Sequence, residues 1–152
     1  MIEIREDDLS GEATQALLAL HLAGMRENTP VCHVFALDYA GLQVPEVTVW
    51  SAWRGGAIAG IGALRVLGDG GGEVKSMRTH PDHLRRGVGA AILDHIIGEA
   101  RRRGYPRLSL ETGRGPSFEP ALALYRARGF VSGGAFEGYE ASDFNQFMHL
   151  SL

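Results

Sequence analysis

The sequence predicts a mixed α/β fold of the α+β class, and two stretches of the chain carry this prediction. Residues 73–79 read as a strand that a glycine turn joins to an amphipathic helix, and Arg107–Thr112 reads as the next strand. Strands joined by such a crossover run parallel. Val47–Arg54 and Ala57–Leu67 flank Gly55-Gly56 and predict an antiparallel hairpin instead. Parallel and antiparallel strands are therefore expected together in one layered fold.

The N-terminal part of the chain adds a strand and two helices. Met1–Glu6 alternates polar and apolar residues, as a half-buried strand does. Ser10 is a suitable N-cap for a helix that runs to about Arg26, and Asn28-Thr29-Pro30 ends that helix. Residues 31–40 then predict a second, short helix.

The helix after the glycine turn has the clearest pattern in the chain. Its apolar stripe recurs every four residues and consists of Val88, Ile92 and Ile96. Gly104 can adopt the left-handed conformation that ends a helix, and Pro106 prevents its continuation. Strands near residues 130–136 and 146–152 complete the expected sheet.

Length and composition bound the class of protein. The 152 residues predict one domain, 1–152, and 45% hydrophobic residues suffice for a packed core. A net charge of −3 and a pI near 6.0 give no footprint of nucleic-acid binding. The longest apolar stretch, Ala57–Leu64, is too short for a membrane span, and the N-terminus lacks the apolar run of a signal peptide. With the single Cys32, which suits a reducing compartment, this predicts a cytoplasmic protein.

The turn before this helix has the composition of an anion site. Arg85 and Arg86 precede Gly87-Val88-Gly89, at the point where the helix begins. Free backbone amides and the helix dipole favour negative charge there, and glycines let a ligand approach the main chain. A phosphate or pyrophosphate ligand is therefore expected.

Two common glycine-loop motifs do not match this turn. The dinucleotide fingerprint needs a third glycine where Ile92 stands, and the triphosphate loop needs a Gly-Lys-Ser/Thr tripeptide that the chain lacks. The six histidines have no supporting acids or cysteines at ligand spacing, so no metal is predicted.

The turn resembles the pyrophosphate loop of the GNAT superfamily, the acyl-CoA-dependent N-acetyltransferases. That loop reads Arg/Gln-x-x-Gly-x-Gly/Ala after a strand, and Arg85–Ala90 is similar to it except that Leu84 stands where the family has Arg or Gln. Leu110–Gly113 follows at the next strand. Leu124–Phe130 resembles the family's Leu-Tyr-x-x-x-Gly-Phe segment. The order of elements matches the family from about Glu73 to the C-terminus.

The resemblance implies a fold, a cosubstrate and a reaction. The fold is a twisted, mostly antiparallel mixed sheet of about six or seven strands, flanked by helices, with a splayed strand pair that binds CoA. Acetyl-CoA would donate the acetyl group directly to a primary amine of a small molecule in a ternary complex. The predicted cosubstrate site comprises the main chain of Met77, Arg78 and Thr79 and the loop residues Arg85, Arg86, Gly87, Val88, Gly89 and Ala90.

Three side chains are the candidates for proton transfer. Tyr125 matches the family's general acid near the sulfur, and its phenol pKa of about 10 lies near that of an alkyl thiol. Glu111 and Glu73 are the candidates for the general base, with Glu111 slightly preferred, and relaying water also serves. Structural roles stay open for each: a core aromatic for Tyr125, pairing with an arginine for Glu111, and capping of an exposed strand start for Glu73.

The acceptor and the oligomeric state stay open. Side chains that could form the acceptor pocket are His33, Leu37, Asp38, Phe118, Tyr139, Asp143 and Asn145. They do not distinguish an amino acid from a polyamine, an antibiotic or a protein N-terminus, and a homodimer stays open. A non-catalytic acyl-CoA-binding module is the main alternative, and a nucleotide- or nucleic-acid-binding protein is the more distant one.

Overall fold

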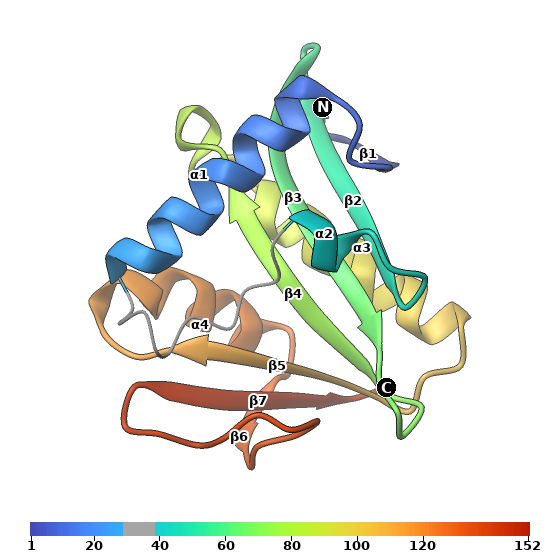
Figure 1. Ribbon diagram of the computed structural model, residues 1–152, viewed down its shortest axis with the longest axis vertical. Coiled ribbons are helices and arrows are strands. Elements are labelled where there is room, and N and C mark those ends of the chain that lie inside the picture. The colour runs from blue at the N-terminus through green and yellow to red at the C-terminus, as the bar shows by residue number, and fades with distance from the viewer. Residues whose placement is uncertain (29–38) are drawn as a thin grey trace.

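Seven strands form one sheet in the order β1-β2-β3-β4-β5-β7-β6 (Figure 1). The structure is a computed structural model that describes residues 1–28 and 39–152. The strands are β1 Glu3–Glu6, β2 Val47–Arg54, β3 Ala57–Val66, β4 Gly72–Thr79, β5 Arg107–Gly113, β6 Val131–Gly133 and β7 Asn145–Ser151. The helices are α1 Glu12–Asn28, α2 Tyr39–Leu42, α3 Val88–Arg102 and α4 Glu119–Ala127, with short 3-10 turns at Pro81–His83 and Pro116–Phe118.

The predicted class is confirmed, because the sheet is mixed and mostly antiparallel. β4 and β5 precede and follow α3 in the sequence and are parallel neighbours in the sheet. The other strand pairs are antiparallel. The hairpin of β2 and β3 turns at Gly55-Gly56 as expected. Gly104 ends α3 with φ +80°, and the amide of Tyr105 donates to the carbonyl of Ala100, which completes the cap.

Two local predictions differ from the structure, and a third concerns residues that the structure mostly does not describe. Ser10 is not the N-cap, because α1 begins at Glu12, and the hydroxyl and amide of Ser10 both donate to Asp8. The strand predicted near residues 130–136 is limited to Val131–Gly133, because a glycine pair follows Ser132 and carries no side chain to pack. The short helix expected at 31–40 falls mostly outside the described residues; only the four-residue α2 is seen.

Helices cover both faces of the sheet (Figure 1). α3 packs through its predicted stripe, and Val88, Ile92 and Ile96 are all buried in a cluster that also includes α4. α1 packs on the opposite face with Leu17 and Leu18 against β3. The sheet therefore separates two hydrophobic layers, one on the α3–α4 face and one on the α1 face.

Two glycines of β3 allow α3 to lie close to the sheet. A Cβ on Gly60 would fall 2.8 Å from Cγ1 of Val88, and one on Gly62 would fall 2.5 Å from Cγ2 of Ile92. Either distance is too short for real side chains, so a larger residue would push the helix away. These glycines fix the position of the N-terminus of α3.

The parallel strands β4 and β5 diverge along their length (Figure 1). Only Gly72 with Leu108 and Glu73 with Ser109 are in register, whereas β5 pairs with β7 along all seven of its residues. Beyond Glu73, the backbone groups of β4 that face β5 have no partner strand. This is the splayed strand pair that the resemblance to the GNAT superfamily implied.

A bulge in β4 changes which side chains face α1. Lys75 pairs with Ala63 and Arg78 with Ile61, so two β4 residues stand opposite one residue of β3. Ser76 takes a left-handed φ of +56° at this point. Because of the bulge, Lys75 and Arg78 lie on the same face although they are three residues apart.

Candidate active site

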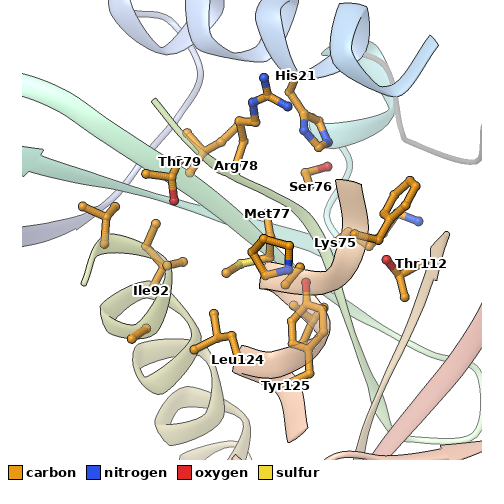
Figure 2. Close-up of a pocket in the computed structure, with 18 of the residues that line it drawn as sticks. His21, Lys75, Ser76, Met77, Arg78, Thr79, Ile92, Thr112, Leu124 and Tyr125 are labelled. Atoms are coloured by element: carbon orange, nitrogen blue, oxygen red, sulfur yellow. The ribbon is translucent and has the colours of Figure 1, made fainter. Parts of the chain in front are cut away.

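One cavity of about 750 Å³ opens where β4 and β5 diverge (Figure 2). It is lined by both strands, the turn before α3, α4 and His21 of α1. Eleven of the twelve predicted site residues line it, namely Glu73, Met77, Arg78, Thr79, Arg85, Gly87, Val88, Gly89, Ala90, Glu111 and Tyr125. The twelfth, Arg86, is exposed on the turn outside the cavity wall.

The turn before α3 has the backbone of an anion cradle. Arg85 has a φ of +61° and Gly87 a φ of +79°, and α3 begins at the next residue. The first intrahelical bond runs from the amide of Ala91 to the carbonyl of Gly87, which leaves the amides of residues 88–90 without a helical partner. Free amides at the start of a 15-residue helix fit a phosphate group.

Glu111 lies half-buried on β5 and faces the cavity. Burial raises its pKa to about 6, although a hydrogen bond from Asn145 and the charge of Lys75 lower it. A carboxylate with a pKa near 6 is ionised at neutral pH but is more basic than an ordinary glutamate. Glu111 can therefore accept a proton or hold an ammonium group.

Glu73 is buried in a network of hydrogen bonds. One oxygen, Oε2, accepts from Lys75 Nζ at 3.0 Å and from the Tyr139 hydroxyl at 2.6 Å, and Oε1 lies 3.5 Å from Arg65 Nη1. Lys75 also donates to the Tyr139 hydroxyl. Burial, followed by the charge of Glu73, raises the pKa of Tyr139, which keeps its proton for this network. This arrangement favours a role for Glu73 in positioning the side chains of Lys75 and Tyr139.

Tyr125 packs inward from α4, and its side chain is 7% exposed. Its ring contacts Phe130 with centroids 5.7 Å apart. Figure 2 shows the hydroxyl pointing into the cavity, toward β4. Burial raises the pKa of Tyr125 to about 12, so the phenol stays protonated and can donate.

The predicted acceptor residues are divided between the cavity and other places. Phe118 and Tyr139 line the cavity. Asn145 is tied to Ser142 and to the carbonyl of Glu140, so it also fixes the loop before β7. Asp143 lies outside the cavity wall. His33, Leu37 and Asp38 lie outside the described residues.

Sequence reasoning missed several residues that line the cavity, among them His21, Lys75 and Ser76. Lys75 had a signal, because Glu73 and Lys75 stand two residues apart and place opposite charges on one face of the strand. His21 and Ser76 had none, since their position depends on the packing of α1 over the bulge.

Among the described residues, no group of histidines, cysteines and acids is placed to hold a metal ion. No helix in the described part of the chain is long and apolar enough to cross a bilayer.

The splayed strands, the anion cradle and the acid and base candidates on one cavity define the class of acyl-CoA-dependent transferases. Residues 14–130 match the family model of the acetyltransferase (GNAT) family. The chain belongs to this family and is an acetyltransferase.

Two curated relatives match the chain over nearly its whole length. YedL of Escherichia coli, an uncharacterized N-acetyltransferase, is 45% identical over 100% of this chain and 96% of the relative. YsnE of Bacillus subtilis, also an uncharacterized N-acetyltransferase, is 46% identical over 99% of this chain and 100% of the relative. Their names give the reaction class and leave the acceptor open.

Solved structures share the fold. A Klebsiella pneumoniae protein assigned provisionally as an acyl-CoA N-acyltransferase superposes with a TM-score of 0.81 at 26% identity, covering 100% of this chain and 98% of that one. A GNAT family acetyltransferase of Elizabethkingia anophelis, whose structure has acetyl-CoA bound, superposes with a TM-score of 0.70 at 16% identity, covering 99% and 98%. The second likeness shows the fold alone.

Proposed function

We propose that this protein transfers the acetyl group of acetyl-CoA to a primary amine of a small molecule by direct attack in a ternary complex. The observation that carries the proposal is that the anion cradle, Glu111 and Tyr125 all line one cavity at the β4–β5 divergence. The amine nitrogen forms a bond to the acetyl carbon, and the bond from that carbon to the CoA sulfur breaks.

The cosubstrate would lie along the splayed face of β4. Its pyrophosphate fits the free amides of residues 88–90, with Arg85 on the wall of the cavity. The unpaired main chain of Met77 and Thr79 can bond to the pantetheine arm and polarise the acetyl carbonyl. Arg86 lies outside the cavity wall, so we assign the cradle chiefly to the backbone and to Arg85.

Glu111 is the proposed base. An amine is protonated at neutral pH and must lose a proton before it attacks the thioester. The carboxylate of Glu111 can attract the ammonium group and take that proton, because its pKa of about 6 is raised by burial. Glu73 already accepts from Lys75 and Tyr139, so its proposed role is to hold these two side chains at the cavity wall.

Tyr125 is the proposed acid. When the carbon–sulfur bond breaks, the thiolate needs a proton, and the Tyr125 hydroxyl points into the cavity. With its pKa at about 12 the phenol is protonated throughout the physiological range. The new amide nitrogen releases its second proton to solvent, and Tyr125 recovers its own proton from solvent after the product leaves. The reaction is proposed for the reducing cytoplasm, in keeping with the single Cys32.

The test is turnover of acetyl-CoA with a panel of primary amines, measured as free thiol released and as acetylated amine formed. A thermal-shift series with CoA, acetyl-CoA, NAD and ATP accompanies it, because a ligand of the folded state raises its stability. We expect a rise with CoA and acetyl-CoA only, and amine-dependent thiol release. Binding of acetyl-CoA with no acetylated product from any amine would favour the non-catalytic acyl-CoA-binding module.

A further inference from the structure

Three buried polar atoms in the described part of the chain have no hydrogen-bond partner, and their residues all line the same cavity. They are Nδ1 of His21, Oγ of Ser76 and Nε of Arg78. Buried polar groups are paired in the large majority of cases, so unpaired groups that share one cavity indicate a place where a polar ligand binds.

The three side chains lie together on the α1 face of the sheet. The β4 bulge directs Arg78 to this face, opposite Ile61. Figure 2 shows His21 reaching down from α1 toward Ser76, with the end of the Arg78 side chain beside His21 and with Leu124 and Tyr125 below β4. The cluster is therefore separate from the anion cradle at the start of α3.

The cluster presents donors and a single positive charge. His21 is 93% buried, since its side chain is 7% exposed, and burial, with the charge of Arg78, lowers its pKa to about 4. The imidazole is thus neutral at pH 7 and can donate from one ring nitrogen. The Ser76 hydroxyl can rotate to donate, and Arg78 only donates.

We propose that His21, Ser76 and Arg78 bind a carboxylate of the acceptor, so that the acceptor is an amine that carries a carboxylate, such as an amino acid. This inference rests on the proposed acetyl transfer and names the substrate class for the same site. A planar carboxylate offers several acceptor sites to the three donors, and its one charge matches that of Arg78.

The charges around the cavity select a monoanion with a cationic end. A phosphate dianion would meet one guanidinium and a neutral histidine, with the acid Glu111 in the same cavity. Glu73 is neutralised by Lys75, which leaves Glu111 to attract the ammonium group. An amino acid therefore has its negative end at Arg78 and its positive end at Glu111.

The experiment compares each amino acid with its carboxamide, which keeps the amine and lacks the carboxylate charge. The pairs are glycine, β-alanine, γ-aminobutyrate, lysine and phenylalanine with the corresponding carboxamides, and the readout is the ratio of kcat/KM for acid over amide. Wild-type protein is expected to prefer the acid of at least one pair by about 100-fold. Arg78→Gln is expected to lower this ratio about 10- to 100-fold, since a charge-assisted bond is lost. Ser76→Ala should lower it by a smaller factor.

A matched control is Arg101→Gln, which removes an exposed arginine at the end of α3 and should leave the ratio at the wild-type value. Because the ratio is internal to each variant, partial loss of folded protein does not change it. A wild-type ratio near one for every acetylated pair overturns the inference without any variant. So does an Arg78→Gln ratio equal to that of wild type.

Failure of the proposed function has a different outcome. If other primary amines are acetylated but none of these acids or amides is, the carboxylate inference is wrong and acetyl transfer stands. If no amine of any kind yields an acetylated product, the proposed function itself is wrong, and this inference falls with it.

Discussion

The two faces of the sheet at the β4–β5 divergence differ in how fully their groups are paired. On the α3–α4 face, apolar side chains pack against the sheet, and the ligand is expected to meet backbone amides. On the α1 face, Glu73 and Lys75 neutralise each other, while Ser76 and Arg78 each keep a buried polar atom unpaired. Under the proposed function, the backbone would hold the constant partner, acetyl-CoA, and side chains would hold the variable acceptor.

The backbone half can be disrupted at one residue. Gly87 has a φ of +79°, and Gly87→Val adds a branched side chain where we place the pyrophosphate, so we expect acetyl-CoA affinity to be lost. Calorimetric titration with acetyl-CoA measures this loss. Gly56→Val is the control, since Gly56 has a φ of +83° in the β2–β3 hairpin and bears the same backbone strain away from the cavity. Equal affinity in the Gly87 and Gly56 variants would refute the cradle.

The role of the proposed base, Glu111, can be tested separately from cosubstrate binding. Glu111→Gln should lower kcat by about 10²- to 10³-fold with acetyl-CoA affinity retained. The wild-type rate should fall as pH drops below about 6, the pKa of Glu111, and the variant should lose this dependence. Glu46→Gln removes an exposed carboxylate outside the cavity and should behave as wild type. A normal rate at every pH in Glu111→Gln would return the role to water or to Glu73.

Glu111→Gln is expected to raise the stability of the fold although it lowers kcat. Because the pKa of Glu111 is raised from 4.5 to about 6 in the folded state, the folded form holds its proton more tightly than the unfolded chain. Stability is therefore lost as pH rises from about 4.5 to 6, and the loss is complete above 6. Allowing for partial exposure, Glu111→Gln should gain about 1 kcal/mol at pH 8 and nothing at pH 4. Thermal unfolding at both pH values measures it.

The acid can be removed without changing the packing. Tyr125→Phe keeps the ring against Phe130 and deletes the hydroxyl, so we expect kcat to fall about 10²-fold with little change in acetyl-CoA binding. Single-turnover kinetics isolates the chemical step. Tyr105→Phe, outside the cavity, is the control. If Tyr125→Phe keeps the full single-turnover rate, Tyr125 is a core aromatic and solvent protonates the thiolate.

The buried pair on the α1 face tests whether Glu73 is structural. Lys75→Met leaves the buried carboxylate of Glu73 with only Arg65 as a cation at 3.5 Å, and we expect a loss of about 3 kcal/mol in the free energy of unfolding. Urea titration measures it. The double variant Glu73→Gln/Lys75→Met should recover part of the loss. No recovery in the double variant would mean that the two side chains do not act as a pair.

The sequence predicted the features that depend on neighbouring residues and missed those that depend on contacts between distant ones. The strand order around α3, the hairpin at Gly55-Gly56 and the turn of Arg85–Ala90 depend on neighbours in sequence, so periodicity and glycine spacing predicted them. The pairing of Glu73 with Tyr139 joins residues 66 positions apart, and no local pattern announces it. Ser76 faces His21 only because β4 contains a bulge, which a strand pattern does not reveal.

The strand order has a consequence for self-association. The two edges of the sheet are formed by its shortest strands, β1 with four residues and β6 with three. A second chain that extended the sheet at either edge would find only a short row of backbone groups to pair with. Short edge strands are a common protection against strand-to-strand aggregation. If a homodimer forms, we therefore expect it to be built from helix or loop surfaces rather than from a sheet continued across two chains.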